Sequence, residues 1–361
     1  MAAGSGLNEG MDRLNAGESL APGQSIESTD GRFRLTVEPD GNIILSGPGG
    51  AVRWSAQTAG HPGSTLSMQA DGNLVLYDAG SVAIWATQTW GHPGALVVVQ
   101  DDGNLVVYAA NGQTPLWATN TWLISRHVEG FAPSTSGFAF RNDYPVGTRW
   151  PVLDLPIVGE VISADAGNGL CGGFSFAVVD MFLAQPRLVP PRDATRPPAH
   201  GPHFDYLCHR FLDSFNGAIP YGTILKVLDW IETPANDDFL RHGLGHMTAV
   251  DEWPHIKRDI DSNRPSPIVL VGSPQGDLGD IATVKHALAD SHQVVACGYD
   301  LGPEDVTIHV YDPNNPSEDN ATLTVSLAHP EVPVVTANMG REVRGLFRSH
   351  YTWNDPRPVW S

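Results

Sequence analysis

A tripeptide, Asp-Gly-Asn, recurs three times in the first third of the chain and sets the strongest limit on its fold. The copies are Asp40-Gly41-Asn42, Asp71-Gly72-Asn73 and Asp102-Gly103-Asn104, so each step is 31 residues long. A tryptophan follows each copy, at Trp54, Trp85 and Trp117. One unit of this length cannot bury its own apolar face, so the three units must pack against one another.

Each repeat has the pattern of short antiparallel strands. Apolar and polar residues alternate before the Asp-Gly-Asn turn, and a second alternating stretch such as Leu74-Val75-Leu76-Tyr77 follows it. A further Gly-containing turn leads to a third strand that ends on the tryptophan. We therefore predict an all-β unit at residues 8–124, with three-fold symmetry and the tryptophans inside.

The second and third repeats share five positions with the pattern Q-x-D-x-N-x-V-x-Y. These are Gln69, Asp71, Asn73, Val75 and Tyr77, then Gln100, Asp102, Asn104, Val106 and Tyr108. Residues two apart in a strand share a face, so the five side chains of each set project to one side. Such a face offers hydrogen-bond donors and acceptors for vicinal hydroxyls and an apolar patch for a sugar ring.

This repeat resembles the bulb-type (monocot) mannose-binding lectins, from Leu14 through Trp122 and including the lead-in Gly17-Glu18-Ser19-Leu20. The resemblance implies a three-fold β-prism with one mannose site per repeat. It implies that Gln, Asp, Asn and Tyr hydrogen-bond to mannose and that Val touches the ring. The five positions of the first repeat are Glu38, Asp40, Asn42, Ile44 and Ser46. They depart from the pattern because Glu replaces Gln, Ile replaces Val and Ser replaces Tyr. We expect its site to be weak or empty.

Residues 125–361 lack the repeat and form a second predicted domain. Residue patterns predict helices at 224–231 and 249–260, and strands at 266–271, 292–299, 306–312 and 321–326. Helices first and strands later indicate an α+β domain. The proline-rich stretch 186–202 predicts a surface loop.

Three residues of this domain suggest nucleophilic chemistry. Cys171 opens an apolar stretch that predicts a buried helix, and a helix N-terminus favours the thiolate. Glycines flank Cys171, and we expect them to let a substrate chain approach. His292 begins one predicted strand and Asp312 ends the next, so the two side chains are expected to touch. Nucleophile, base and orienting acceptor are the groups that acyl transfer needs.

The order Cys, His, Asp resembles papain-like cysteine peptidases. By this resemblance Cys171 is the nucleophile, His292 the base and Asp312 the orienting residue. The family's oxyanion donor, a Gln, corresponds here to Asp165, whose carboxylate is unsuited to that task. Asn168 is the candidate replacement; the alternative is an inactive site. The chain is then either a mannose-targeted peptidase, amidase or transacylase, or a non-catalytic carbohydrate-binding protein with a silent papain-like scaffold.

Charge and composition limit the partners. With 21 basic and 40 acidic residues the formal net charge is −19, which opposes nucleic-acid binding. No apolar run is long enough to cross a membrane. Expected partners are mannose-containing glycans and a protein or peptide substrate. The first 20 residues lack a signal-peptide pattern, so we expect a cytoplasmic protein or non-classical export.

No cofactor and no metal site are predicted. His242 and His246 are four residues apart, but Gly243 and Gly245 interrupt the helix that a zinc motif would need. Cys208 and Cys297 are expected to be structural thiols.

Overall fold

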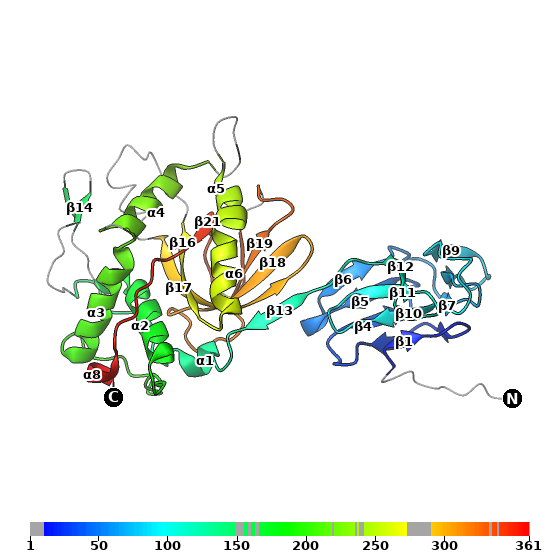
Figure 1. Cartoon of the computed structure of the whole chain (residues 1–361), viewed down its shortest axis with the longest axis horizontal. Coiled ribbons are helices and arrows are strands. Elements are labelled where there is room, and N and C mark those ends of the chain that lie inside the picture. Colours follow the sequence, from blue (N-terminus) through cyan, green and yellow to red (C-terminus); the bar gives the residue numbers. More distant parts are fainter. Residues whose placement is uncertain are drawn as a thin grey trace. The chain divides into compact units, whose positions relative to one another are not determined.

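The computed structural model divides into two compact units, Met1–Ile124 and Ser125–Ser361 (Figure 1). It describes residues 11–148, 155–157, 160–162, 166–218, 220–234, 237, 242–272, 290–331, 334–337 and 339–360. For residues 155–157, 160–162, 168, 335 and 337 the backbone alone is described. Among the described helices, none has the length and apolar character that a membrane span requires.

The first unit consists of three four-stranded antiparallel sheets, one per repeat. The first sheet contains β3 (Ser25–Glu27), β4 (Arg34–Val37), β5 (Ile43–Ser46) and β6 (Val52–Ser55). The second contains β2 (Ser19–Leu20), β7 (Thr65–Met68), β8 (Leu74–Tyr77) and β9 (Ala83–Ala86). The third contains β1 (Arg13–Leu14), β10 (Leu96–Val99), β11 (Leu105–Tyr108) and β12 (Pro115–Ala118). The 3-10 turn η1 (Pro48–Gly50) joins β5 to β6.

The three sheets repeat the same register. In each, the tryptophan pairs with the third residue of the central strand, as Leu45 with Trp54, Leu76 with Trp85 and Val107 with Trp117. The three indole rings meet edge to face, with centroids 5.6, 5.7 and 5.9 Å apart. The expectation that these tryptophans lie inside is correct only in part. They contact one another but are only partly buried, because the core against which they pack is already filled by mostly aliphatic side chains.

The second unit contains a seven-stranded antiparallel sheet with the order β20-β19-β18-β17-β16-β21, in which β13 also pairs with β17. The strands are β13 (Ile124–His127), β16 (Ser266–Val271), β17 (His292–Leu301), β18 (Asp305–Tyr311), β19 (Thr322–Ser326), β20 (Val335–Ala337) and β21 (Gly345–Arg348). A separate hairpin pairs β14 (Leu155–Ile157) with β15 (Glu160–Ile162). The predicted strand at 266–271 is confirmed with its bounds, and the other three predicted strands are confirmed within two residues.

Helices precede and flank this sheet. They are α1 (Pro133–Ser136), η2 (Ala166–Asn168), α2 (Cys171–Leu183), α3 (Pro202–Phe215), α4 (Gly222–Glu232), α5 (Leu244–His246), the π-helical η3 (Met247–Glu252), α6 (Trp253–Asp261) and α8 (Arg357–Trp360). The helix predicted at 224–231 is confirmed as α4, and the one at 249–260 is continuous with α5 but widens into a π-turn before α6. The predicted loop is irregular up to Gly201, and α3 begins at its last proline, a residue suited to the first helical position.

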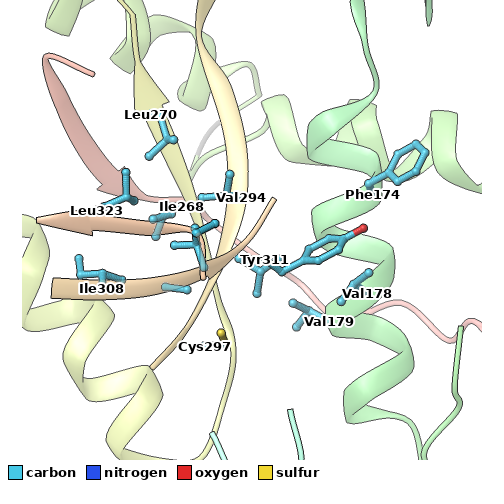
Figure 2. Packing of buried hydrophobic residues seen from close by; sticks show 14 of the residues in the cluster. Phe174, Val178, Val179, Ile268, Leu270, Val294, Cys297, Ile308, Tyr311 and Leu323 are labelled. Carbon is cyan, nitrogen blue, oxygen red and sulfur yellow. The ribbon is translucent and has the colours of Figure 1, made fainter. Parts of the chain in front are cut away.

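Alternate residues of β16 pack into different clusters. Ile268 and Leu270 belong to the main core with residues of α2, while Val269 and Val271 pack with α4. The apolar stretch Ile268–Val271 of this strand is therefore covered on both sides. Figure 2 shows Tyr311 of β18 reaching toward Val178 and Val179, which lie on α2. This contact holds the middle of α2 against the strands that carry the site described below.

Candidate functional sites

The Asp-Gly-Asn turn of the second repeat is held by two threonines. The Asn73 N–H donates to Asp71 Oδ1 at 3.0 Å, and Asn73 Oδ1 accepts from Thr87 Oγ1 at 3.2 Å and from the Thr89 N–H at 3.1 Å. Thr89 Oγ1 in turn donates to the Gly72 carbonyl at 2.7 Å. Because these bonds use the amide oxygen, the Nδ2 group is the part of Asn73 that remains to donate to a ligand.

The third repeat reproduces this network. Asn104 Oδ1 accepts from Thr119 Oγ1 and from the Thr121 N–H, at 3.1 and 3.3 Å. Sequence reasoning missed these threonines, although the Thr-x-Thr spacing occurs after both motifs. They are positioning residues that fix the orientation of the asparagine amide.

Glutamine and tyrosine form the other half of each site. Gln69 Nε2 donates to the Tyr77 hydroxyl at 2.9 Å, and Gln100 Nε2 donates to the Tyr108 hydroxyl at 2.8 Å. Each bond leaves the glutamine oxygen as an acceptor and the tyrosine O–H as a donor. With the asparagine Nδ2 and the second aspartate oxygen, each repeat presents two donors and two acceptors.

The valines lie on the same side of the strands as these polar groups. Leu74 and Leu76 belong to the core cluster of the unit, whereas Val75 between them does not. Val106 has the same position in the third repeat, and both valines are only 2% exposed. Their methyl groups therefore form the floor of each site rather than a protruding contact.

The first repeat keeps the turn and loses the other half. Asn42 Oδ1 accepts from Ser55 Oγ and the Thr58 N–H, as in the other repeats. Ser46 replaces the tyrosine, and its hydroxyl donates to the Arg34 carbonyl at 3.4 Å. The amide-to-phenol hydrogen bond of the other two repeats has no counterpart here, because Glu38 replaces the glutamine.

In the second unit, β17 and β18 bring His292 and Asp312 together. His292 is the first residue of β17 and Asp312 directly follows β18, so the antiparallel pairing brings them together where β17 begins and β18 ends. His292 Nε2 lies 2.7 Å from Asp312 Oδ1, and both side chains are buried. Asp312 Oδ1 also accepts from the Asn314 N–H at 2.9 Å, which fixes the carboxylate.

Cys171 is the first residue of α2, and its thiol is hydrogen-bonded to the His292 imidazole. Burial raises the pKa of the Cys171 thiol, but the bond and charge of His292 and the Gln293 N–H outweigh it, so the pKa is lowered. Burial lowers the pKa of His292, but Asp312 and Cys171 outweigh it and raise the pKa. Opposite shifts of the two pKa values favour a thiolate–imidazolium pair.

The other two cysteines have a different environment. Burial raises the pKa of the Cys208 thiol to about 12 and that of the Cys297 thiol to about 12. Cys297 Sγ donates to the His309 carbonyl at 3.4 Å. Of the three thiols, Cys171 alone has a base beside it and partial exposure to solvent.

The glycines around Cys171 do not open the site to a substrate, contrary to our expectation. A Cβ on Gly172 would lie 2.1 Å from Ser214 Oγ, and one on Gly173 would lie 2.2 Å from the Leu207 carbonyl oxygen. Both partners belong to α3, so these glycines allow α3 to pack closely against α2.

Two further residues near Cys171 were not predicted. Asn142 Oδ1 accepts from the Leu170 N–H at 2.7 Å, and the Asn142 N–H donates to the Pro313 carbonyl at 3.0 Å. Asn142 thus ties the residue before the cysteine to the turn that carries Asp312. The positive charge of Arg341 contributes to the lowered pKa of Cys171.

The two residues considered for the oxyanion cannot be placed. Asp165 and the side chain of Asn168 lie outside the described residues; the Asn168 backbone forms the end of η2.

No family model and no curated protein matches this chain. Among solved structures, a Marasmius oreades lectin is 34% identical over 32% of this chain and 97% of its own, with a TM-score of 0.30. A monomeric monocot mannose-binding lectin from Gastrodia elata is 36% identical over 31% of this chain and 98% of its own, with a TM-score of 0.28. The mannose-specific agglutinin from snowdrop (Galanthus nivalis) bulbs, solved with methyl-α-D-mannoside, is 35% identical over 30% of this chain and 96% of its own, with a TM-score of 0.26. The N-terminal part of the chain, about 30% of its length, is thus similar to bulb-type mannose-binding lectins.

Proposed function

We propose that this chain is a mannose-directed cysteine hydrolase, in which residues 8–124 bind mannose-containing glycans and residues 125–361 form a papain-like hydrolase domain. The observation that carries the sugar-binding part is the same polar site built twice at the repeat period. The observation that carries the hydrolase part is the hydrogen-bonded series Cys171, His292 and Asp312. A lectin domain on the same chain would raise the local concentration of the hydrolase at a glycosylated surface.

The sugar sites are matched to a hexose with vicinal hydroxyls. Asn73 Nδ2 and the Tyr77 O–H donate, while Asp71 and Gln69 accept, so neighbouring hydroxyls find partners of both kinds. The second set, built on Asn104, repeats this geometry. We expect two working sites per chain, each of roughly millimolar affinity, or about −4 kcal/mol.

Binding to immobilised mannose tests this assignment. The double variant Asn73→Ala/Asn104→Ala should lose retention on a mannose resin, because each change removes the donor that the threonines orient. Asn42→Ala is the matched control, since it makes the same change in the turn of the first repeat. Full retention of the double variant, or equal loss in the control, would refute the site assignment.

The hydrolase reaction follows from the thiolate–imidazolium pair. The Cys171 thiolate attacks an acyl carbon, and the His292 imidazolium gives its proton to the leaving amine or alcohol as the thioester forms. A water molecule, deprotonated by His292, then attacks the thioester and releases the acid and the Cys171 thiol. Asp312 holds the imidazole and stabilises its protonated form. Peptidases and amidases share these steps, whereas in a transacylase another acceptor nucleophile replaces the water and takes the acyl group.

Backbone N–H groups at the start of α2 are the first candidates for stabilising the oxyanion. The residue before the helix is Leu170, which makes no side-chain cap, and the first-turn N–H groups of a helix have no intrahelical partner. Asn168 stays our candidate for the second donor.

The pH dependence of Cys171 alkylation by iodoacetamide tests the nucleophile. In the native chain the rate should persist well below the ordinary thiol pKa, because the thiolate of a lowered-pKa cysteine survives there and is lost only as the pH falls through the lowered value. His292→Ala should move the profile to higher pH, while Asp312→Asn should move it less.

Cys208 and Cys297 serve as internal controls in the same experiment. Because their pKa values are raised, mass mapping should find them unlabelled in the folded chain. If Cys171 is labelled no faster than these two, the hydrolase proposal falls, and the chain is a carbohydrate-binding protein with a silent scaffold.

A further inference from the structure

Two histidines and an aspartate gather on one face of the sheet, at some distance from Cys171. They are His127 on β13, Asp300 on β17 and His309 on β18, and their nitrogen and oxygen ligand atoms all lie within 4.8 Å of one another. Asp300 is eight residues along β17 from His292, roughly 25 Å in an extended strand. The cluster is therefore separate from the proposed nucleophile.

A glycine makes the cluster possible. Gly298 pairs directly with His309 across β17 and β18, and a Cβ at Gly298 would lie only 2.3 Å from His127 Nδ1. Without a side chain between them, the two imidazole rings approach to a centroid distance of 5.0 Å. Any other residue at this position would push the rings apart.

The carboxylate of Asp300 is oriented by its neighbours. One oxygen lies 2.8 Å from His309 Nε2, and the other accepts from the hydroxyl of Ser125, which lies on β13 with His127. An outer partner that holds a ligating carboxylate is typical of protein metal sites. The three side chains also stand on adjacent hydrogen-bonded strands, which fix the positions of their backbones.

The donor set determines which ligand fits. Two imidazole nitrogens and one carboxylate oxygen suit Zn²⁺ and similar divalent ions, with water completing the coordination. His127 is exposed, and the other two residues are partly exposed, so an ion can enter from solvent.

We propose that His127, Asp300 and His309 bind a divalent transition-metal ion of the Zn²⁺ class. The ion would join β13, the strand that opens the second unit, to β17 and β18. Its expected effect is structural, since it cross-links three strands and His127 of β13 lies far from Asp300 and His309 in the sequence. The proposal does not depend on the function of Cys171.

Cobalt substitution is the direct test. The full chain, with Cys171 replaced by Ala to remove the only partly exposed thiol among the described residues, is titrated with Co²⁺ and then with Zn²⁺ as a competitor. We expect one Co²⁺ per chain with visible d–d bands and without a thiolate charge-transfer band. Absence of binding at millimolar Co²⁺, or a thiolate band, overturns the proposal.

Variants locate the ion. His127→Ala and His309→Ala should each weaken Zn²⁺ binding by at least about tenfold, and Ser125→Ala by about tenfold through loss of the outer partner. The matched control is His242→Ala/His246→Ala, which removes a second His–His–Asp group, with Asp237, in the same unit. If binding survives in the first two variants or disappears in the control, the ion is not held where we propose.

Should His309→Ala fail to fold, His127→Gln gives the same answer, because His127 is exposed at the start of the unit and its ring is not part of the core. Unchanged Zn²⁺ affinity in a folded His127→Gln variant likewise overturns the proposal.

Discussion

The two units build their polar sites over very different sequence distances. In the first unit, Gln69 is hydrogen-bonded to Tyr77, eight residues away, and Asn73 to Thr89, sixteen residues away. The third repeat has the equivalent bonds at similar spacing. In the second unit, Ser175 of α2 donates to the carbonyl of Gln293, 118 residues later, and this long-range packing places Cys171 beside His292. A local site is visible in a sequence because its spacing is fixed by one strand and one turn. A site assembled from distant segments is visible only as separate residues.

The same contrast applies to stability. The first unit has one core to which its three repeats contribute equivalent residues, whereas the second includes single buried contacts such as the Asp180–Arg210 ion pair.

The largest effect is expected at the buried ion pair between α2 and α3. Asp180 and Arg210 are 0% and 2% exposed, and the carboxylate also accepts from the hydroxyls of Tyr206 and Tyr351. Asp180→Ala leaves the guanidinium buried without its main partner and should cost about 3–5 kcal/mol. Hydrogen exchange in urea, followed by mass spectrometry, should show this loss in peptides of the second unit and unchanged protection in the first.

Asp213 provides the control for this change. It pairs with the same arginine but is 46% exposed, so Asp213→Asn should cost less than about 1 kcal/mol. If Asp180→Ala weakens both units equally, the two do not unfold separately, and our division at residues 124 and 125 is wrong.

The next largest effect concerns the close approach of α3 to α2. Gly172→Ala would place a methyl group 2.1 Å from Ser214 Oγ, and relieving this overlap should cost about 1–3 kcal/mol. Adding Ser214→Ala should restore part of the loss, because the two changes act on one contact. Urea midpoints of the single and double variants measure this coupling. Additive losses would show that the contact between these two residues is not the cause.

The sequence predicted most of the first unit and only fragments of the second. The 31-residue period fixed the three sheets, because each turn and strand lies within one repeat. The sequence did not indicate α3, whose buried Arg210 looks like a surface residue until Asp180 is known to face it. It did not indicate β13 either, since Ile124–His127 is mostly exposed and is a strand only through its pairing with β17. The glycines next to Cys171 were misinterpreted for the same reason, as their packing partner Ser214 lies on the unpredicted helix.

A smaller effect is expected in the sugar sites. Tyr77→Phe keeps the ring and removes the hydroxyl that Gln69 holds, so affinity at that site should fall by about 1 kcal/mol, or roughly fivefold. The converse change tests the repeat itself: Glu38→Gln with Ser46→Tyr restores the missing pair in the first repeat. Calorimetry with methyl-α-mannoside should then give three sites per chain instead of two. A stoichiometry that stays at two would mean that the five motif positions are not sufficient.

The smallest effect is expected from Arg341, which acts on the Cys171 thiol through charge alone. Arg341 contributes less than His292 does to the lowered pKa of the Cys171 thiol. It also contributes less than His292 does to the lowered pKa of the Asp312 carboxyl. Arg341→Gln should therefore raise the pKa of Cys171 slightly and slow alkylation at about pH 6 by less than about threefold, or about 0.6 kcal/mol. Salt separates the two influences, because a distant charge is screened while a hydrogen bond is not. Raising the ionic strength of the native chain should reproduce most of the Arg341→Gln effect and little of the His292→Ala effect. If salt has no effect on the native rate, the charge of Arg341 does not reach the thiol, and His292 with the Gln293 N–H accounts for the whole shift.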